Sequence, residues 1–334
     1  MKVFVDAFLE NNLGDDLFVD ILTKRYKNHQ FYALSTYYKT QGNIKVFSNE
    51  FVLKVIRRLG LKKIFANRCD LCVIIGGSMY IESGEKPKLN LGKKPYYILG
   101  TNFGPYKTQE YYNTVHDFFK GAEDVCFREK YSFDKFPDLK NVRYAPDIVF
   151  SMDTSNVKIT NNKKVVFSII SCEKKLDSKY KESYEKAVIQ LTKYFVKKGY
   201  KICYMSFCQK EGDEEAINEI ADKCGENVEK YFYRGNREEA LNKLGDCQII
   251  IGGRFHANIL GLLLHKTIIP MMYSDKTKNV LEEMNFKGKI LDIRKLDNFN
   301  VEDLTEEDIT YKQDISYQIS NANLQFKELD KKLK

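Results

Sequence analysis

The sequence predicts an α/β protein built from two doubly wound, Rossmann-like domains, and three observations lead to this class. Short apolar runs, typical of buried strands, alternate with amphipathic stretches, typical of helices. The alternation stops at a polar segment, residues 151–164, and then starts again. A chain of 334 residues is long enough for two domains that each bury a core. Alternating strands and helices favour parallel sheets with helices on both faces.

The first series of elements occupies the N-terminal half of the chain. We predict its strands at residues 2–5, 31–34, 44–47, 69–75, 95–99 and 124–127, and its helices at 17–26, 51–61 and 109–120. Asp15 or Asp16 suits the N-cap of the first helix. We place the end of this first domain, residues 1–155, inside the polar segment.

The second series repeats the pattern. We predict its strands at residues 165–170, 200–206, 247–251, 267–271 and 290–293, and its helices at 179–197, from 212, and at 240–244, 254–264 and 278–284. Apolar residues recur at helical spacing from Ile315 to Leu333, which predicts a long C-terminal helix. The expected organisation is therefore a second domain at 156–300 and a helical tail at 301–334.

Composition and charge limit the classes of partner and the cellular location that we expect for this protein. The formal net charge is +8, but the lysines are mixed with acidic residues, so we do not predict a nucleic-acid partner. A mild positive excess suits anionic substrates or peripheral association with a lipid surface. No apolar run reaches the roughly 20 residues that cross a bilayer. Asp6 interrupts the apolar N-terminus, so we expect a first strand and loop there and not a signal peptide. We expect a cytoplasmic protein, compatible with a position at the inner face of the membrane.

The eight cysteines predict neither a disulfide framework nor a metal site. Cys69 and Cys72 form a single CxxC, without a second such pair or a histidine pair at ligand spacing. Cys72 stands in a strand-like run, so we expect it in the core. No metal or cofactor is predicted, and free thiols fit a cytoplasmic protein.

The most informative stretch joins the strand at 247–251 to the next helix. Gly252 and Gly253 allow a sharp turn and a close approach of the backbone to a ligand. A helix N-terminus after a glycine turn binds anions, because free N–H groups and the positive end of the helix dipole converge there. Arg254 and His256 stand at this point, in the first helical turn. The alternative is a tight turn followed by a structural histidine.

Other loops that follow predicted strands carry polar residues or glycines. They contain Asn12, Gly14 and Asp15, then Gly76 and Gly77, then Gly104, and finally Arg128. In doubly wound sheets, ligands bind beyond the carboxyl ends of the strands, where such loops lie. A capped turn explains the first loop equally well. Arg128 has the alternative of pairing with Glu129 or Asp134 at the surface.

Taken in order, these segments resemble the polysaccharide pyruvyl transferase family. The resemblance rests on Asn12-x-Gly14-Asp15, Gly76-Gly77, Gly104-Pro105, Arg128-Glu129-x-x-Ser132, Pro146-Asp147 and Gly252-x-Arg254-x-His256-Ala257, followed by Pro270, Tyr273 and Lys276. Ser78 stands where the family usually has a third glycine. The resemblance spans roughly residues 1–290.

The resemblance implies a GT-B-like arrangement with a cleft and a specific reaction. Members move the enolpyruvyl carbons of phosphoenolpyruvate onto two hydroxyls of one sugar, which forms a cyclic pyruvate ketal and phosphate. Arg254 and Arg128 would bind the anionic donor, supported by Gly252 and Gly253 and more weakly by Lys276. His256 would protonate the donor's methylene carbon, because histidine exchanges protons near neutral pH. Asp15 is a candidate general base.

The acceptor side is less defined. The candidate acceptor or loop residues are Asn12, Gly14, Gly76, Gly77, Gly104 and Tyr273. The identity of the sugar, its linkage to a lipid or a nucleotide, and homo-oligomer formation stay open. Two other functions fit the same pattern: a GT-B glycosyltransferase that uses a nucleotide sugar, and a non-catalytic subunit of a polysaccharide-assembly complex.

Overall fold

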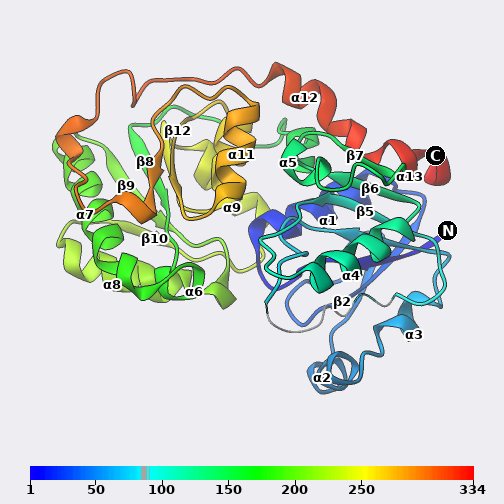
Figure 1. The fold of residues 1–334 in the computed structure, drawn as a ribbon. Coiled ribbons are helices and arrows are strands. Elements are labelled where there is room, and N and C mark those ends of the chain that lie inside the picture. Colours follow the sequence, from blue (N-terminus) through cyan, green and yellow to red (C-terminus); the bar gives the residue numbers. More distant parts are fainter. Residues whose placement is uncertain (84–88, 90) are drawn as a thin grey trace. The chain divides into compact units, whose positions relative to one another are not determined.

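The computed structural model describes residues 1–83, 89 and 91–334, without the side chain of Arg57. The described residues form two compact units (Figure 1). The first unit contains residues 1–10, 15–152 and 316–334, and the second contains residues 11–14 and 153–315. Residues 316–334, which we predicted to contain one long helix, belong to the first unit and form three short helical segments.

The first unit is built on a parallel sheet. Its strands are β1 (Lys2–Asp6), β2 (Gln30–Leu34), β3 (Ile44–Phe47), β4 (Leu71–Ile75), β5 (Tyr96–Thr101), β6 (Asp124–Phe127) and β7 (Val142–Tyr144). Within the described chain the spatial order is β3-β2-β1-β4-β5-β6-β7, and each neighbouring pair is parallel.

The second unit repeats this topology. Its strands are β8 (Lys164–Ser168), β9 (Lys201–Met205), β10 (Glu229–Tyr231), β11 (Ile249–Gly252), β12 (Thr267–Met272) and β13 (Leu291–Asp292). The order β10-β9-β8-β11-β12-β13 matches the first six positions of the other sheet, again with parallel pairs. Both sheets therefore have the doubly wound order that the sequence predicted.

Helices connect the strands in both units. In the first unit they are α1 (Leu13–Arg25, except for its first two residues), α2 (Glu50–Leu59), α3 (Lys62–Ala66), α4 (Gln109–Lys120), α5 (Lys130–Phe133), η1 (Ile148–Ser151), α12 (Ser316–Ala322), η6 (Asn323–Phe326) and α13 (Lys327–Leu333). In the second they are α6 (Cys172–Lys175), η2 (Ser178–Tyr180), α7 (Lys181–Lys197), η3 (Gln209–Glu211), α8 (Asp213–Cys224), α9 (Arg237–Gly245), α10 (Phe255–Leu263), α11 (Asp275–Glu283), η4 (Ile293–Lys295) and η5 (Val301–Asp303). None of the helices within the described residues is long and apolar enough to span a bilayer.

The cores lie on both faces of each sheet. Every residue of β4, β6, β8 and β11 is buried, and successive side chains of a strand point to opposite faces, so both faces are covered. Cys72 is fully buried in β4, as predicted, and burial raises the pKa of its thiol to about 12. All eight cysteines are buried thiols that form no disulfide.

Helix α1 begins four residues earlier than the prediction at residue 17. The side chain of Asn12 accepts a hydrogen bond from the N–H of Gly14 at 3.1 Å, so Asn12 caps the helix while Asp15 and Asp16 lie in its first turn. Strands β7 and β10 were not predicted. Each has only three residues with few apolar side chains, because each lies at the edge of its sheet.

One buried amide helps to anchor the C-terminal segment within the first unit. The side chain of Gln325 accepts a hydrogen bond from the N–H of Gly100 at 2.9 Å. It also donates to the carbonyl oxygens of Phe127, Ala145 and Pro146 at 3.0, 2.7 and 3.2 Å. These groups lie in β5, at the end of β6 and after β7, so a residue distant in sequence joins three parts of the sheet.

We predict that Gln325→Ala lowers the free energy of unfolding by about 3 kcal/mol, because buried backbone groups lose their partners. Urea unfolding followed by circular dichroism measures the change. Asn321→Ala is the control, since its amide bonds the Tyr317 carbonyl at an exposed position of the same segment. Equal stability of the two variants would contradict this role.

Candidate active site

The strand order of each sheet reverses at one point, between β1 and β4 in the first unit and between β8 and β11 in the second. Ligands of doubly wound sheets bind beyond the carboxyl ends of the strands at this point. Gly76 and Gly77 directly follow β4, and Gly253 and Arg254 directly follow β11. The fold therefore places these predicted residues where such sheets carry their sites.

The glycine turn after β11 is packed tightly. Gly252 pairs with Ser168 of β8, and the N–H of Gly253 donates to the Ser168 carbonyl at 3.0 Å. A Cβ on Gly253 would lie 2.5 Å from that carbonyl oxygen, and one on Gly252 would lie 2.1 Å from the side-chain oxygen of Asn258. Packing within the turn thus requires both glycines, whether or not a ligand approaches them.

Arg254 is the N-cap residue of α10 and lies in a buried ion-pair cluster. Its Nε donates to Asp213 at 3.1 Å, its Nη2 bonds the other oxygen of Asp213, and its Nη1 bonds Glu211. The side chain of Arg254 is 7% exposed and that of Asp213 is 0% exposed. Asp213 also accepts the N–H groups of Phe207 and Cys208, each at 2.9 Å. These bonds hold the guanidinium in a fixed position.

The charges of this cluster balance one another. Lys175 pairs with Glu211, so two cations, Arg254 and Lys175, meet two carboxylates. Burial opposes ionisation of Arg254, but Asp213 and Glu211 outweigh it and raise its pKa. Burial would likewise raise the pKa of Glu211, but Arg254 and Lys175 hold it below the ordinary value. The bonds to the carboxylates use three of the five N–H donors of the guanidinium.

Tyr273, directly after β12, is influenced by three cations at this edge of the sheet. Burial alone would raise the pKa of its hydroxyl, but Lys276, Lys175 and Arg254 together lower it. The Nζ of Lys276 lies 5.4 Å from the centre of the Tyr273 ring. A site whose cations favour phenolate also favours a bound phosphate or carboxylate.

His256 lies in the first turn of α10, against the backbone of Gly14. Residues 11–14 belong to the second unit: Asn12 forms a β-bridge with Cys208, and the N–H of Leu13 donates to the Phe207 carbonyl at 3.0 Å. A Cβ on Gly14 would lie 1.9 Å from Nδ1 of His256. Only glycine at position 14 therefore leaves room for the imidazole where it is.

The first unit holds its arginine in a similar way. Arg128, directly after β6, is buried and donates to Asp147 at 3.2 Å and to the side chain of Asn102 at 2.8 Å. Asp147 is also buried and caps η1 by accepting the N–H of Val149 at 2.9 Å. A Cβ on Gly77 would lie 2.5 Å from Nη1 of Arg128, so this glycine leaves space for the guanidinium.

The other predicted residues of the first unit lie in neighbouring loops and in the first turn of α1. A Cβ on Gly76 would lie 3.3 Å from Oδ1 of Asp15, which places the carboxylate beside the turn after β4. The N–H of Gly104 donates to the Tyr80 carbonyl at 2.8 Å, and Asn102 donates to the Gly104 carbonyl at 3.4 Å. Asp15, Gly76, Gly77, Gly104 and Arg128 thus surround the carboxyl ends of β4, β5 and β6.

The sequence analysis missed several residues of these clusters. They are Lys175, Glu211 and Asp213 in the second unit and Asn102 in the first. Asp213 stands among acidic residues that suit a helix start, so nothing in the sequence separates it from Glu214 or Glu215. In the described part of the chain, no group of three or more His, Cys, Asp or Glu residues is placed to hold a metal ion.

Comparison with known protein families explains why these segments occur together in this order. The family model described as polysaccharide pyruvyl transferase matches residues 12–275. The chain belongs to the polysaccharide pyruvyl transferase family. This match starts at Asn12 and includes Arg128, Arg254, His256 and Tyr273. A curated relative, the amylovoran biosynthesis protein AmsJ of Erwinia amylovora, is 21% identical over 84% of this chain and 81% of its own length.

Solved structures support the fold of this family member. Anabaena Alr3699/HepE, in complex with UDP and glucose, has a TM-score of 0.55 at 12% identity, over 98% of this chain and 95% of its own. The Methanocaldococcus jannaschii UDP-GlcNAc 2-epimerase, in complex with UDP-GlcNAc and UDP, has a TM-score of 0.57 at 8% identity, over 87% and 88%. The chain therefore has a GT-B-like fold, as predicted.

We predict that Arg254→Ala lowers the free energy of unfolding by about 3–5 kcal/mol, because Asp213 is left buried without its cationic partner. Urea unfolding of the purified variant measures this loss. Arg234→Ala is the matched control: Arg234 pairs with Glu214 in the same unit but is half exposed, so its loss costs less than about 1 kcal/mol. Similar stability of both variants would show that the buried pair does not hold the turn.

Proposed function

We propose that this chain transfers the pyruvyl group of phosphoenolpyruvate to a sugar of a surface polysaccharide or of its lipid-linked precursor. The products are a cyclic pyruvate ketal and phosphate. The observation that carries the proposal is the family match over residues 12–275, because it includes both clusters of polar residues at the strand ends. The similarity to a protein named for amylovoran biosynthesis supports a role in exopolysaccharide synthesis.

The donor fits the charges of the second unit. Phosphoenolpyruvate carries a phosphate and a carboxylate, and at the ends of β11 and β12 the cations Lys276, Lys175 and Arg254 lower the pKa of Tyr273. We assign donor binding to Arg254, to Lys276 and to the backbone at Gly252 and Gly253. Arg128 in the first unit stays a candidate for the second anionic group of the donor.

In this proposal, the reaction begins with proton transfer from an acid to the donor, and attack by a nucleophile follows. His256 donates a proton to the methylene carbon of phosphoenolpyruvate, so that C2 becomes electrophilic. One sugar hydroxyl attacks C2, the C2–O bond to phosphate breaks, and a second hydroxyl of the same sugar closes the ketal. Two hydroxyl protons are released while one is taken up at carbon, so a general base is useful, and Asp15 is our candidate. Gly14 contributes by leaving space for the imidazole.

The acceptor side stays the least defined part of the proposal. Asn12, Gly14, Gly76, Gly77, Gly104 and Tyr273 are our candidates for acceptor contacts or for shaping the loops around the acceptor. Rings such as Tyr273 suit stacking against a sugar. An acceptor at a membrane surface would require the enzyme to work there.

We predict that the purified protein releases phosphate from phosphoenolpyruvate only with a suitable acceptor, and that His256→Ala slows release about 10²–10⁴-fold while donor binding persists. The assay uses a panel of lipid-linked and nucleotide-linked sugars, with mass spectrometry of the product and calorimetry of donor binding. His116→Ala is the control, since His116 belongs to a different cluster and pairs with Asp138.

Each result of this assay has a distinct meaning. Turnover by His256→Ala at the rate of the unchanged protein would exclude its role as the acid. Binding of a nucleotide sugar, without binding of phosphoenolpyruvate, would favour a GT-B glycosyltransferase. Polysaccharide synthesis in cells that is unaffected by His256→Ala would favour a non-catalytic assembly subunit.

We predict that Lys276→Met weakens phosphoenolpyruvate binding about tenfold, because one cation of the donor site is lost. The same variant raises the pKa of Tyr273, since Lys276 is the strongest of the charges that lower it. Calorimetry measures the first effect, and absorbance titration compared with Tyr273→Phe measures the second. Lys278→Met, two residues along α11 and paired at the surface with Glu282, should change neither.

A further inference from the structure

Helix α2 exposes an apolar face that the fold of the first unit does not use. Leu53 and Ile56 are buried, whereas Phe51 and Leu59 are 78% and 63% exposed and Val52 and Val55 are also exposed. At about 100° per residue, the four exposed residues occupy one arc of roughly 100° beside the buried pair. The helix thus has a second apolar stripe that faces solvent.

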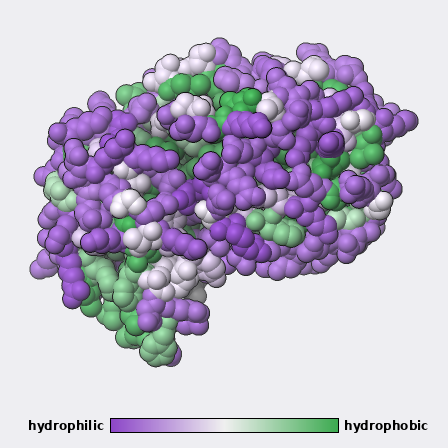
Figure 2. Space-filling model, turned by 180° about the vertical axis from the view of Figure 1, so that it is seen from behind, coloured by the Kyte–Doolittle hydropathy of each residue, from purple (hydrophilic) through white to green (hydrophobic). Residues whose placement is uncertain are grey.

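This stripe continues beyond the helix. Phe47 at the end of β3 and Ile64 of α3 are exposed, and the ring of Phe47 lies 5.7 Å from that of Phe65. Figure 2 shows hydrophobic residues gathered at the lower left of the view, over α2 and its surroundings. We call Phe47, Phe51, Val52, Val55, Leu59 and Ile64 the α2 patch. A contiguous apolar surface of this kind marks an interaction site more often than scattered apolar residues do.

The segment that carries most of the α2 patch is rich in positive charge, although Lys62 pairs with Asp6. Residues 50–68 contain six Lys or Arg and one Glu. Lys54 and Arg58 border the exposed stripe on the helix, on the side opposite to Ile56. Lys54 is mostly exposed, and its ion pair with Glu50 is at the surface. Long basic side chains beside an apolar stripe can reach lipid phosphates while the stripe enters the acyl region.

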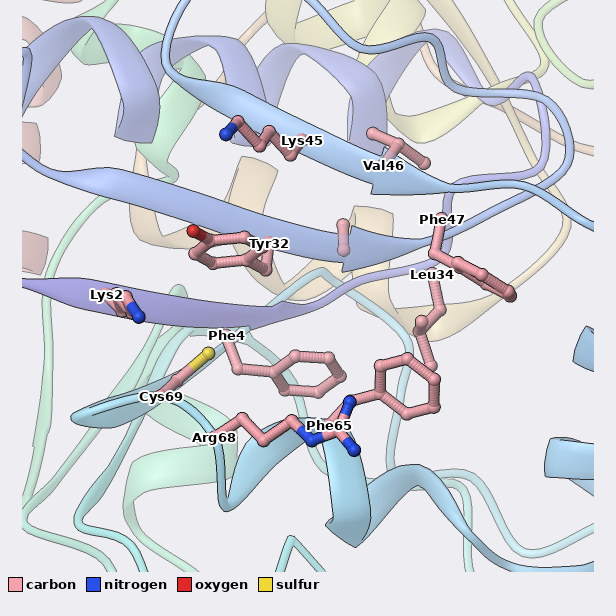
Figure 3. A pocket seen from close by; sticks show the side chains of 11 residues that line it. Lys2, Phe4, Tyr32, Leu34, Lys45, Val46, Phe47, Phe65, Arg68 and Cys69 are labelled. Carbon is pink, nitrogen blue, oxygen red and sulfur yellow. The ribbon is translucent and has the colours of Figure 1, made fainter.

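A cavity of about 420 Å³ continues the apolar surface (Figure 3). Its walls include Phe4, Leu34, Phe47 and Phe65, so it shares Phe47 with the α2 patch. Lys2, Lys45 and Arg68 also line it. An apolar hollow with cations around it has the same chemistry as the patch: it suits an apolar chain with an anionic head.

We propose that the α2 patch docks this chain on an anionic lipid bilayer, with α2 lying in the interface. The charge complementarity favours this occupant, since each Lys or Arg near an anionic bilayer surface is attracted to it. A second copy of the chain would bring two equally basic surfaces together, which is unfavourable. The proposal is independent of the pyruvyl transfer, but it would bring the enzyme to lipid-linked acceptors.

Vesicle binding tests the proposal without any substrate. The full chain is sedimented with vesicles of phosphatidylcholine, with or without phosphatidylglycerol. We expect binding to the anionic vesicles at least about tenfold tighter than to the neutral ones, and weaker binding at high salt. Phe51→Ser combined with Leu59→Ser should weaken binding about tenfold or more, and so should Lys54→Gln combined with Arg58→Gln.

The matched control is Tyr317→Ser combined with Ile319→Ser. These side chains are 63% and 40% exposed on α12 of the same unit, outside the α2 patch, so vesicle binding should not change. All the substituted residues are exposed, and thermal unfolding checks that each variant is folded. Equal binding to both vesicle types, or unchanged binding by the Phe51 and Leu59 variant, would overturn the proposal. The proposal would also be overturned if the unchanged chain bound no vesicles but formed a dimer that the Phe51 and Leu59 variant dissociates.

Discussion

The ion pair between Arg254 and Asp213 is the interaction on which the second unit's site depends. An unpaired charge at full burial costs several kcal/mol, so neither residue can leave without the other. Asp213 also accepts two backbone N–H groups of residues 207 and 208, and the same segment contacts residues 12 and 13. One buried carboxylate therefore links the turn after β11, the loop after β9 and the residues that adjoin His256.

The first unit also holds a buried arginine in place with a buried carboxylate. Arg128 pairs with buried Asp147, and Gly77 leaves space for its guanidinium. In the second unit, Gly14 likewise leaves space for the imidazole of His256. Gly14 and Gly77, which the sequence analysis gave as candidate acceptor or loop residues, thus have a structural explanation as well, because a Cβ would displace His256 or Arg128. The two explanations are compatible, since both keep functional groups at the strand ends.

Much of the fold could be predicted because local patterns agreed with the global arrangement. Strands such as β3 and β6 and helix α4 match their predicted bounds, since periodicity and flanking turn residues are clear there. Short edge strands such as β7 and β10 lack this signal. Among site residues, Arg254 and His256 stood out through a glycine turn at a helix start, whereas Lys175 and Asn102 had no local pattern. The amphipathic α2 was predicted as a helix, but its exposed stripe could not be recognised.

The sequence by itself determined the two doubly wound sheets, the loops that carry polar residues and the family resemblance, because these depend on periodicity and on short ordered segments. Only the tertiary structure decided which charges meet. It paired Arg254 with Asp213, brought Gln325 to Gly100, and left Phe51 and Leu59 exposed while Leu53 and Ile56 were buried. The physical reason is that burial and electrostatic pairing depend on contacts between residues far apart in the chain, and no local pattern specifies them.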